Sequence, residues 1–204
     1  MAVVAEQAKI TTVSAYLDLA KPDLGDAVRR LVQCGQTAAV VVPLLFTEAY
    51  HATVDVPQTV SEVTASGEFR LTVGDILGTG DDVAELLGES MAAAGIADQS
   101  SVLLFAVGSS NSAANDAVFD LAGRLTENRQ GPVRACFGTC RPRVSDVLDE
   151  MAEPVAAVPL FLAEGLLLAP LRKLAAERGW QLVEPLAERA AGLVRKRYDA
   201  ARVR

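Results

Sequence analysis

The residue best suited to bind a metal or transfer a proton is the only histidine of the chain, His51. It follows an apolar run, 38–46, whose length and valine content are typical of a buried strand. Ligands of open α/β sheets bind beyond the carboxyl ends of strands, and a neutral imidazole binds divalent metals and takes up protons near physiological pH. Asp55, four residues later, is placed to orient the ring or to carry protons, and Glu48 is a further nearby carboxylate.

Two interpretations of His51 stay open on spacing alone. A lone histidine in a loop is more often a hydrogen-bonded surface residue, and a catalytic metal site usually takes about three protein ligands. A protein that passes its metal ion on needs transient binding, however, and one or two weak ligands suit that task.

Composition and charge exclude several classes of function. Half of the 204 residues are hydrophobic, the formal charge is -7 and the sequence pI is about 4.8. An acidic chain without a basic stripe is not expected to bind nucleic acid. The sequence contains no run of about 18 apolar residues, so no bilayer span is expected. With no signal peptide and three widely placed cysteines, we expect a cytoplasmic protein with free thiols and no metal site at Cys136 and Cys140.

Strand-like and helix-like segments alternate along the chain. Strands are expected at 13–19, 38–46, 69–73 and 102–107, and helices at 24–31, 56–63, 83–94 and 113–127. Alternation of this kind predicts an α/β fold with parallel sheets flanked by helices.

The chain also contains an internal sequence repeat. Val13, Ala15, Pro22 and Asp26 recur 120 residues later, Val42-Pro43-Leu44 and Glu48 recur 116 residues later, and Phe69-Arg-Leu has a counterpart in Trp180-Gln-Leu. This pattern predicts two duplicated lobes, residues 1–95 and 96–204, the first of which lacks its opening β–α unit. His51 is aligned with Leu167 of the second copy, so only the first lobe carries the reactive side chain.

Other motifs are weaker. The turn Val107-Gly-Ser-Ser-Asn111 leads from a strand into a helix, where backbone N–H groups can receive an anion, but it lacks the lysine and glycine spacing of a phosphate loop. No serine-centred nucleophile elbow is present, which argues against a hydrolase. The basic clusters 141–143 and 195–197 are more typical of solvated surfaces.

The segment Pro43 to Pro57 resembles the signature of the sirohydrochlorin chelatases, with a valine- and proline-rich strand, a histidine and then Asp-x-Pro. Further matches in the family's order are Val13-Ser-Ala-Tyr-Leu-Asp18, Val107-Gly-Ser-Ser, Pro159-Leu-Phe-Leu-Ala-Glu-Gly165 and Arg197-Tyr-Asp-Ala-Ala. The resemblance implies two chelatase-like lobes with a tetrapyrrole cleft between them. It also implies ATP-independent insertion of Fe²⁺ or Co²⁺ into sirohydrochlorin, towards sirohaem or cobalamin, with the metal as a substrate and no permanently bound cofactor.

The same resemblance assigns the site residues. His51 would bind the metal and accept pyrrole protons, Asp55 would act with it, and substrate would meet Tyr16, Asp18 and Tyr50. The implied partners are the tetrapyrrole and a divalent metal. Composition predicts no nucleic acid or membrane partner, and an uncovered sheet edge would favour a homodimer.

The sequence departs from the family pattern in two respects. Family members open with a strand that ends in His-Gly-Ser, which this sequence lacks, and the family glycine two residues before the histidine is Ala49 here. We therefore expect weak or absent catalysis and an uncovered sheet edge. Two rivals stay open: a non-catalytic protein of the same fold that binds a tetrapyrrole or delivers metal, and a flavodoxin-like or phosphate-sensing module that uses the 108–111 turn. The sequence does not choose between iron and cobalt.

Overall fold

The computed structural model describes residues 10–17, 20–65, 67–153 and 155–203. The chain divides into two compact units. The first unit comprises residues 1–78 together with 191–204, and the second comprises residues 79–190. Each unit is an α/β structure in which every described strand pair is parallel, as the alternation predicted.

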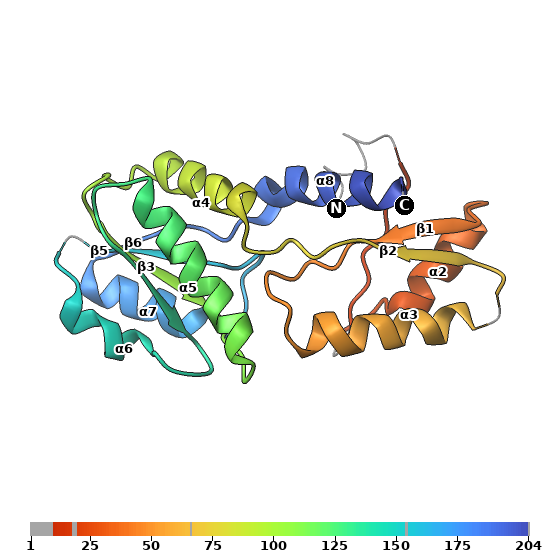
Figure 1. Ribbon diagram of the computed structural model, residues 1–204, viewed down its shortest axis with the longest axis horizontal. Helices are drawn as coiled ribbons and strands as arrows, with labels where there is room; N and C mark the ends of the chain where they lie inside the picture. Colours follow the sequence, from red (N-terminus) through yellow and green to blue (C-terminus); the bar gives the residue numbers. More distant parts are fainter. Residues whose placement is uncertain (1–9, 18–19, 66, 154, 204) are drawn as a thin grey trace. The chain divides into compact units, whose positions relative to one another are not determined.

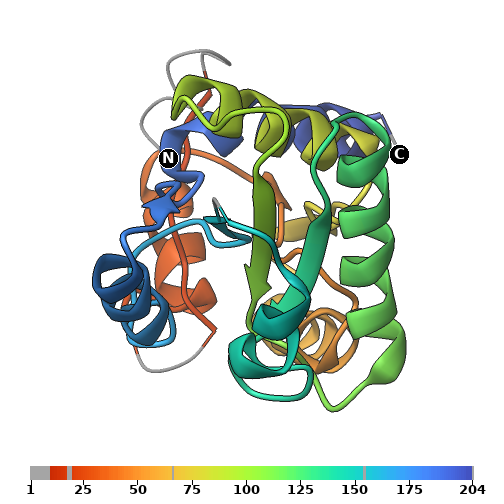
Figure 2. The same cartoon turned by 90° about the vertical axis from the view of Figure 1, so that its left-hand side faces the viewer.

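The second unit is built on a four-stranded sheet in the order β4-β3-β5-β6. Its strands are β3 (Ser101–Ala106), β4 (Val133–Phe137), β5 (Val155–Pro159) and β6 (Gln181–Leu182). Its helices are α4 (Asp81–Ala93), α5 (Ser112–Glu127), α6 (Val144–Val147) and α7 (Ala169–Arg178), with short 3₁₀ turns at Leu148–Glu150 and Ala187–Ala190. Figure 2 shows α5 running beside β4.

Burial explains why β3 and β5 are continuously apolar. Every residue of both strands is buried, because each strand has a neighbour on both edges and helices cover the sheet. Leu103, Phe105 and Cys136 pack into one cluster with Leu168 and Trp180. The Phe105 ring stacks on Phe161, with ring centroids 5.8 Å apart.

The first unit has a smaller sheet. Strands β1 (Ala38–Val41) and β2 (Arg70–Val73) pair with each other. Figure 1 shows α8 (Ala191–Arg202) on one side of them and α2 (Leu24–Gln33) and α3 (Val56–Thr64) on the other. Gly74 follows β2 where α8 approaches closely, since a side chain there would meet Ala201 Cβ at 3.2 Å. No helix among the described residues is both long and apolar enough to cross a bilayer.

The internal sequence repeat is visible in the structure as a pair of similar turns. Lys21–Pro22 and Arg141–Pro142, 120 residues apart, are both cis peptide bonds. In the first copy the carboxylate of Asp26 accepts a hydrogen bond from the N–H of Asp23, and in the second Asp146 accepts one from Arg143. The basic residue before each proline pairs with that same carboxylate, Lys21 at 3.3 Å and Arg141 at 2.9 Å.

One strand expectation is wrong for the described residues. Residues 13–17, the described part of the expected strand 13–19, form no strand, although their counterpart 133–137 forms β4. The reason is pairing: β4 is hydrogen-bonded to β3, whereas β1 pairs with β2 alone among the described strands. An extended segment without a hydrogen-bonded neighbour does not complete a sheet.

The compact units also differ from a division at residue 95. Helix α4 packs on α5 and so belongs with the second unit, while α8 packs on β1 and β2 and so belongs with the first. The match between Phe69-Arg-Leu and Trp180-Gln-Leu also differs from the strand register by two residues. Val40 pairs with Thr72 and its counterpart Ala156 pairs with Gln181, so the register matches Thr72, rather than Arg70, to Gln181.

Candidate functional site

His51 and Asp55 form a hydrogen-bonded pair on a single turn. The turn is a π-helical segment, His51–Asp55, which continues directly into α3. Nδ1 of the ring lies 2.5 Å from Oδ2 of Asp55, and 55% of the histidine side chain is exposed against 26% of the aspartate. The carboxylate is thus held at the protein surface with the ring facing solvent.

The wide turn has a local cause at Pro57. A proline has no N–H and its ring collides with the carbonyl four residues earlier, so an α-helical turn is disfavoured at that point. The N–H of Val56 donates instead to the carbonyl of His51, five residues back. The Thr59 hydroxyl donates to the carbonyl of Asp55 at 2.7 Å and supports the junction from the next turn.

The other predicted site residues lie at different distances from the pair. Tyr50 adjoins it, with its ring edge-on to His51 at 6.4 Å between centroids, and its side chain is exposed. Tyr16 lies on the separate segment 10–17, where its N–H donates to the Pro22 carbonyl at 2.9 Å, and its side chain is half exposed. Asp18 lies outside the described residues. The structure therefore brings together His51, Asp55 and Tyr50.

The geometry of the pair determines which ring nitrogen is available. When Nδ1–H donates to Asp55, the lone pair lies on Nε2, the nitrogen that the carboxylate does not contact. A carboxylate in this position fixes the tautomer and the orientation of the ring, as it does behind histidines that bind metals. Among the described residues, no group of three or more His, Cys, Asp or Glu side chains is placed to hold a metal ion. The pair thus provides one nitrogen that can accept a proton or contact a metal briefly.

Comparison with known families decides the assignment. The CbiX family model matches residues 1–94 and 101–183, most of the chain. The chain belongs to the CbiX family. A curated relative, the sirohydrochlorin ferrochelatase of Bacillus subtilis (strain 168), is 27% identical in an alignment of 169 positions that covers 78% of this chain. The match spans 64% of that relative's own length.

Solved structures agree on the fold of this CbiX-family chain. SirB from Bacillus subtilis with Fe³⁺ has a TM-score of 0.79 at 24% identity, and the match covers 98% of this chain and 87% of SirB. The sirohydrochlorin chelatase SirB from Bacillus subtilis subspecies spizizenii, in complex with cobalt, has a TM-score of 0.73 at 21% identity, covering 98% and 84%. These similarities confirm the predicted α/β chelatase-like fold.

The alternative anion loop of the CbiX-family chain is occupied by its own side chains. The N–H of Ser109 donates to Asn115 Oδ1 at 2.9 Å, that of Asn111 to Ser109 Oγ at 3.1 Å, and that of Ala113 to Asn111 Oδ1 at 3.1 Å. Because these backbone donors already have acceptors, the loop is poorly suited to phosphate, and this observation weighs against the phosphate-sensing hypothesis.

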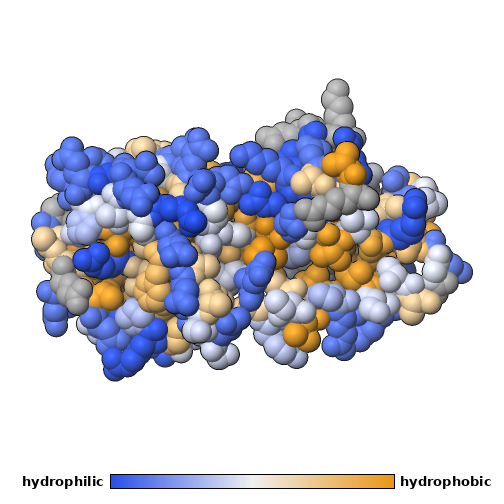
Figure 3. Space-filling model, viewed as in Figure 1, coloured by the Kyte–Doolittle hydropathy of each residue, from blue (hydrophilic) through white to orange (hydrophobic). Residues whose placement is uncertain are grey.

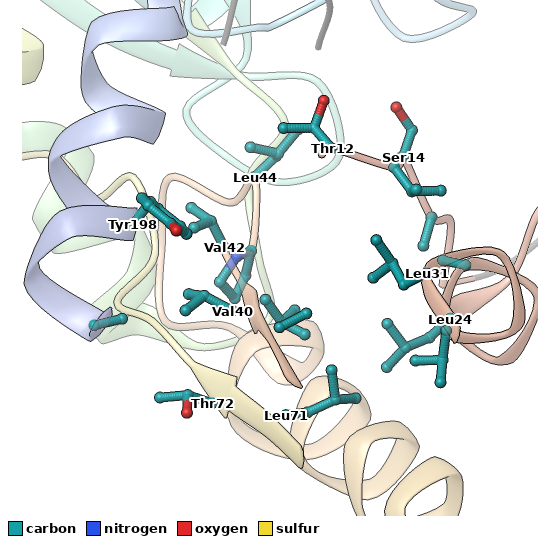
Figure 4. Close-up of a pocket in the computed structure, with 18 of the residues that line it drawn as sticks. Thr12, Ser14, Leu24, Leu31, Val40, Val42, Leu44, Leu71, Thr72 and Tyr198 are labelled. Carbon is teal, nitrogen blue, oxygen red and sulfur yellow. The ribbon is translucent and has the colours of Figure 1, made fainter. Parts of the chain in front are cut away.

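The sequence predicts an uncovered sheet edge in the first unit, and the structure of this CbiX-family chain has a groove there whose size and lining the sequence did not predict. Its volume is about 940 Å³ and it runs along β1, lined largely by aliphatic side chains (Figure 4). Val56 and Thr59 line it from α3, and Tyr16 lines it from the opposite segment, whereas His51 and Asp55 are not among its described lining residues. The signal in the sequence was the apolar run 38–46, whose strand β1 pairs with β2 alone among the described strands.

Proposed function

We propose that this protein inserts a divalent metal ion, Fe²⁺ or Co²⁺, into sirohydrochlorin without ATP. Membership of the CbiX family and similarity to a relative named sirohydrochlorin ferrochelatase support the reaction, and the similar SirB structures contain Fe³⁺ and cobalt. The observation that carries the proposal is the His51–Asp55 pair, because it provides a basic nitrogen oriented by a carboxylate at the predicted position.

The reaction needs a base and a weak metal contact rather than a tight site. Two pyrrole N–H protons leave the macrocycle as the ion forms bonds to its nitrogens, so each turnover releases two protons. Nε2 of His51 accepts a pyrrole proton, and Asp55 stabilises the imidazolium that results. The proton then passes to solvent, because more than half of the His51 side chain is exposed. A single imidazole also releases the metal easily, which suits a substrate ion.

The test is an anaerobic insertion assay that follows the absorption spectrum of sirohydrochlorin with Fe²⁺ or Co²⁺. His51→Ala should lower the rate by about 10²- to 10⁴-fold, the usual contribution of a general base. Glu62→Gln is the matched control, because Glu62 lies on α3 and its exposed carboxylate bonds only Gln58 in the described contacts. Equal rates for His51→Ala and the wild type would exclude the proposed role.

A second candidate is a protein of the same fold that binds the tetrapyrrole or a metal without inserting it. It is favoured by the single histidine and by the absence of a three-ligand cluster among the described residues. Titration with sirohydrochlorin alone, followed by metal addition, separates the two candidates. Spectral binding without conversion on adding Fe²⁺ or Co²⁺ would support the second.

Selectivity between the metals and the assembly state are further proposals. Imidazole and carboxylate accept both Fe²⁺ and Co²⁺, so we propose that availability decides which ion is used. Parallel assays at equal free metal concentration test this directly. The cytoplasmic location and the homodimer remain predictions from the sequence.

A further inference from the structure

The loop that follows β4 in the second unit carries two arginines. Arg141 and Arg143 flank Pro142 in this loop, and both are exposed. Thr139 ties the loop to the end of β3, because its N–H and its hydroxyl both donate to the carbonyl of Val107, at 2.9 and 2.8 Å. The loop leads into α6, and the surface beside that helix is strongly hydrophilic (Figure 3). The arginines therefore lie at the carboxyl ends of β3 and β4, the edge where open α/β sheets bind ligands.

The two arginines differ in how their charge is balanced. The guanidinium of Arg141 pairs with the carboxylate of Asp146 at 2.9 Å. The guanidinium of Arg143 instead donates to two neutral groups, the carbonyl of Gly138 and that of Thr139, the latter at 2.9 Å. Within the described part of the chain, no carboxylate forms an ion pair with Arg143, and its remaining N–H groups have no acceptor. The two carbonyls thus orient a guanidinium whose charge is not compensated.

The repeated turn of the first unit shows that the fold does not require arginine at this position. Arg143 corresponds to Asp23, and each residue follows a cis-proline and precedes a helix. Asp23 forms an ion pair with Lys21. The turn 21–26 therefore contains one cation and two carboxylates, whereas the turn 141–146 contains two cations and one carboxylate. The two turns share their backbone features but have opposite net charge, so the conformation of the turn does not account for Arg143.

An oriented guanidinium without a counter-ion is suited to bind a carboxylate. Its N–H groups form paired, charge-assisted hydrogen bonds with the two oxygens of that group. A phosphate is less favoured here, because the N–H groups of Ser109, Asn111 and Ala113 on the adjoining turn already have acceptors. Because the chain as a whole has a formal charge of -7, attraction of an anion to this loop is a local property.

The substrate of the proposed function supplies carboxylates of this kind, since sirohydrochlorin carries acetate and propionate side chains around its ring. We propose that Arg143 is a substrate-binding residue that holds one of these peripheral carboxylates, with Arg141 adding a second positive charge beside it. The identity of the ligand rests on the proposed function. The contact itself rests on the orientation of Arg143 and its uncompensated charge.

Titration of the whole chain with sirohydrochlorin in the absence of metal tests the contact through the absorption spectrum of the ligand. Arg143→Met should weaken binding about tenfold, because a charge-assisted hydrogen bond to the ligand is lost. Arg143→Lys should weaken it less, because lysine keeps the charge, although it cannot bridge the two loop carbonyls. Arg178→Met is the matched control and should bind as the wild type. It removes the same charge from the last turn of α7, which connects two parallel strands and so ends at the opposite edge of the sheet.

Salt dependence separates a carboxylate contact from a purely structural role of Arg143. Added KCl should weaken sirohydrochlorin binding to the wild type more than to Arg143→Met, because salt screens the charge that the variant lacks. Circular dichroism confirms that the variants fold. Equal salt dependence of the two proteins, or an equal loss of affinity in Arg143→Lys and Arg143→Met, would overturn the proposal, because a loop that is merely held by the guanidinium fork predicts both results.

The insertion assay distinguishes failure of this inference from failure of the proposed function. With Fe²⁺ present, Arg143→Met should raise KM for sirohydrochlorin and leave kcat near the wild-type value, whereas His51→Ala lowers kcat. A wild type that inserts metal but binds sirohydrochlorin no more tightly than Arg143→Met would overturn the carboxylate contact alone. A wild type whose binding depends on Arg143 but which inserts neither metal would overturn the proposed function alone, and a wild type that does not bind sirohydrochlorin would overturn both.

Discussion

Oδ2 of Asp55 lies 2.5 Å from Nδ1 of His51, one π-helical turn earlier in the chain. This contact fixes which nitrogen of the ring faces outward, and it depends on a turn that Pro57 and Thr59 shape from the helix behind it. The site is therefore a property of the turn as a whole rather than of the histidine alone.

Asp55→Asn should lower metal insertion by about 10- to 100-fold, less than loss of the histidine, because the amide cannot stabilise the imidazolium. The single histidine allows an independent readout. Its two ring ¹⁵N resonances should show Nδ1–H in the wild type and mixed tautomers in Asp55→Asn. Glu62→Gln serves as the control, and an unchanged tautomer in Asp55→Asn would contradict a positioning role.

Local patterns predicted most of the fold. The apolar runs predicted β1, β2 and β3, because parallel strands are buried on both faces. The recurrence of Pro22 as Pro142 indicated the duplication, because equivalent residues form equivalent turns. Two features were not predicted from the sequence, because they depend on contacts between residues distant along the chain. The segment 13–17 has the apolar pattern of a strand but no hydrogen-bonded neighbour among the described strands. Helix α8 packs on β1 and β2, which lie more than a hundred residues earlier in the chain.

The candidate site was only partly predictable. The spacing of His51 and Asp55 was enough to propose their pairing, and the structure confirms the contact. The spacing could not reveal the π-helical turn or the separation of Tyr16 onto another segment, because both depend on how the backbone folds around prolines. The catalytic and substrate-binding roles of these residues stay predictions.

Gly108→Ala should destabilise the second unit by roughly 1–3 kcal/mol. Gly108 has φ +87°, and a Cβ there would lie 2.7 Å from Cys140 Sγ and 2.8 Å from Phe137 Cβ. Gly123→Ala in α5 is the matched control, since its Cβ would meet nothing within 4 Å. That variant should gain about 0.5–1 kcal/mol from helix propensity. Urea unfolding monitored by the fluorescence of Trp180, which lies in the second unit, measures both, and equal stability of the two variants would refute the steric argument.

Arg197→Met should loosen α8 from the first unit. Its guanidinium donates to the carbonyls of Ile76 at 2.8 Å and Leu77 at 2.5 Å, and the variant leaves both without this partner. Hydrogen bonds from a charged donor contribute about 1.5–3 kcal/mol, so hydrogen exchange in α8 should accelerate by roughly tenfold or more. Lys196→Met, an exposed neighbour, should leave exchange at the wild-type rate. Similar acceleration in both variants would mean that charge, rather than these hydrogen bonds, holds the helix.

Cys136 should be inert to thiol reagents while the chain is folded. Burial raises the pKa of its thiol from an ordinary 9.0 to about 12, whereas Cys34 is exposed. Because the folded state keeps a proton that the unfolded state loses above pH 9, this group's contribution to stability is complete below pH 9 and declines as the pH rises towards 12. Cys136→Ser adds a buried hydroxyl, so Cys136→Ala is the variant to use. Urea unfolding between pH 8 and 10.5 should show a smaller loss of stability in Cys136→Ala than in the wild type, and rapid labelling of Cys136 at pH 8 would contradict its burial.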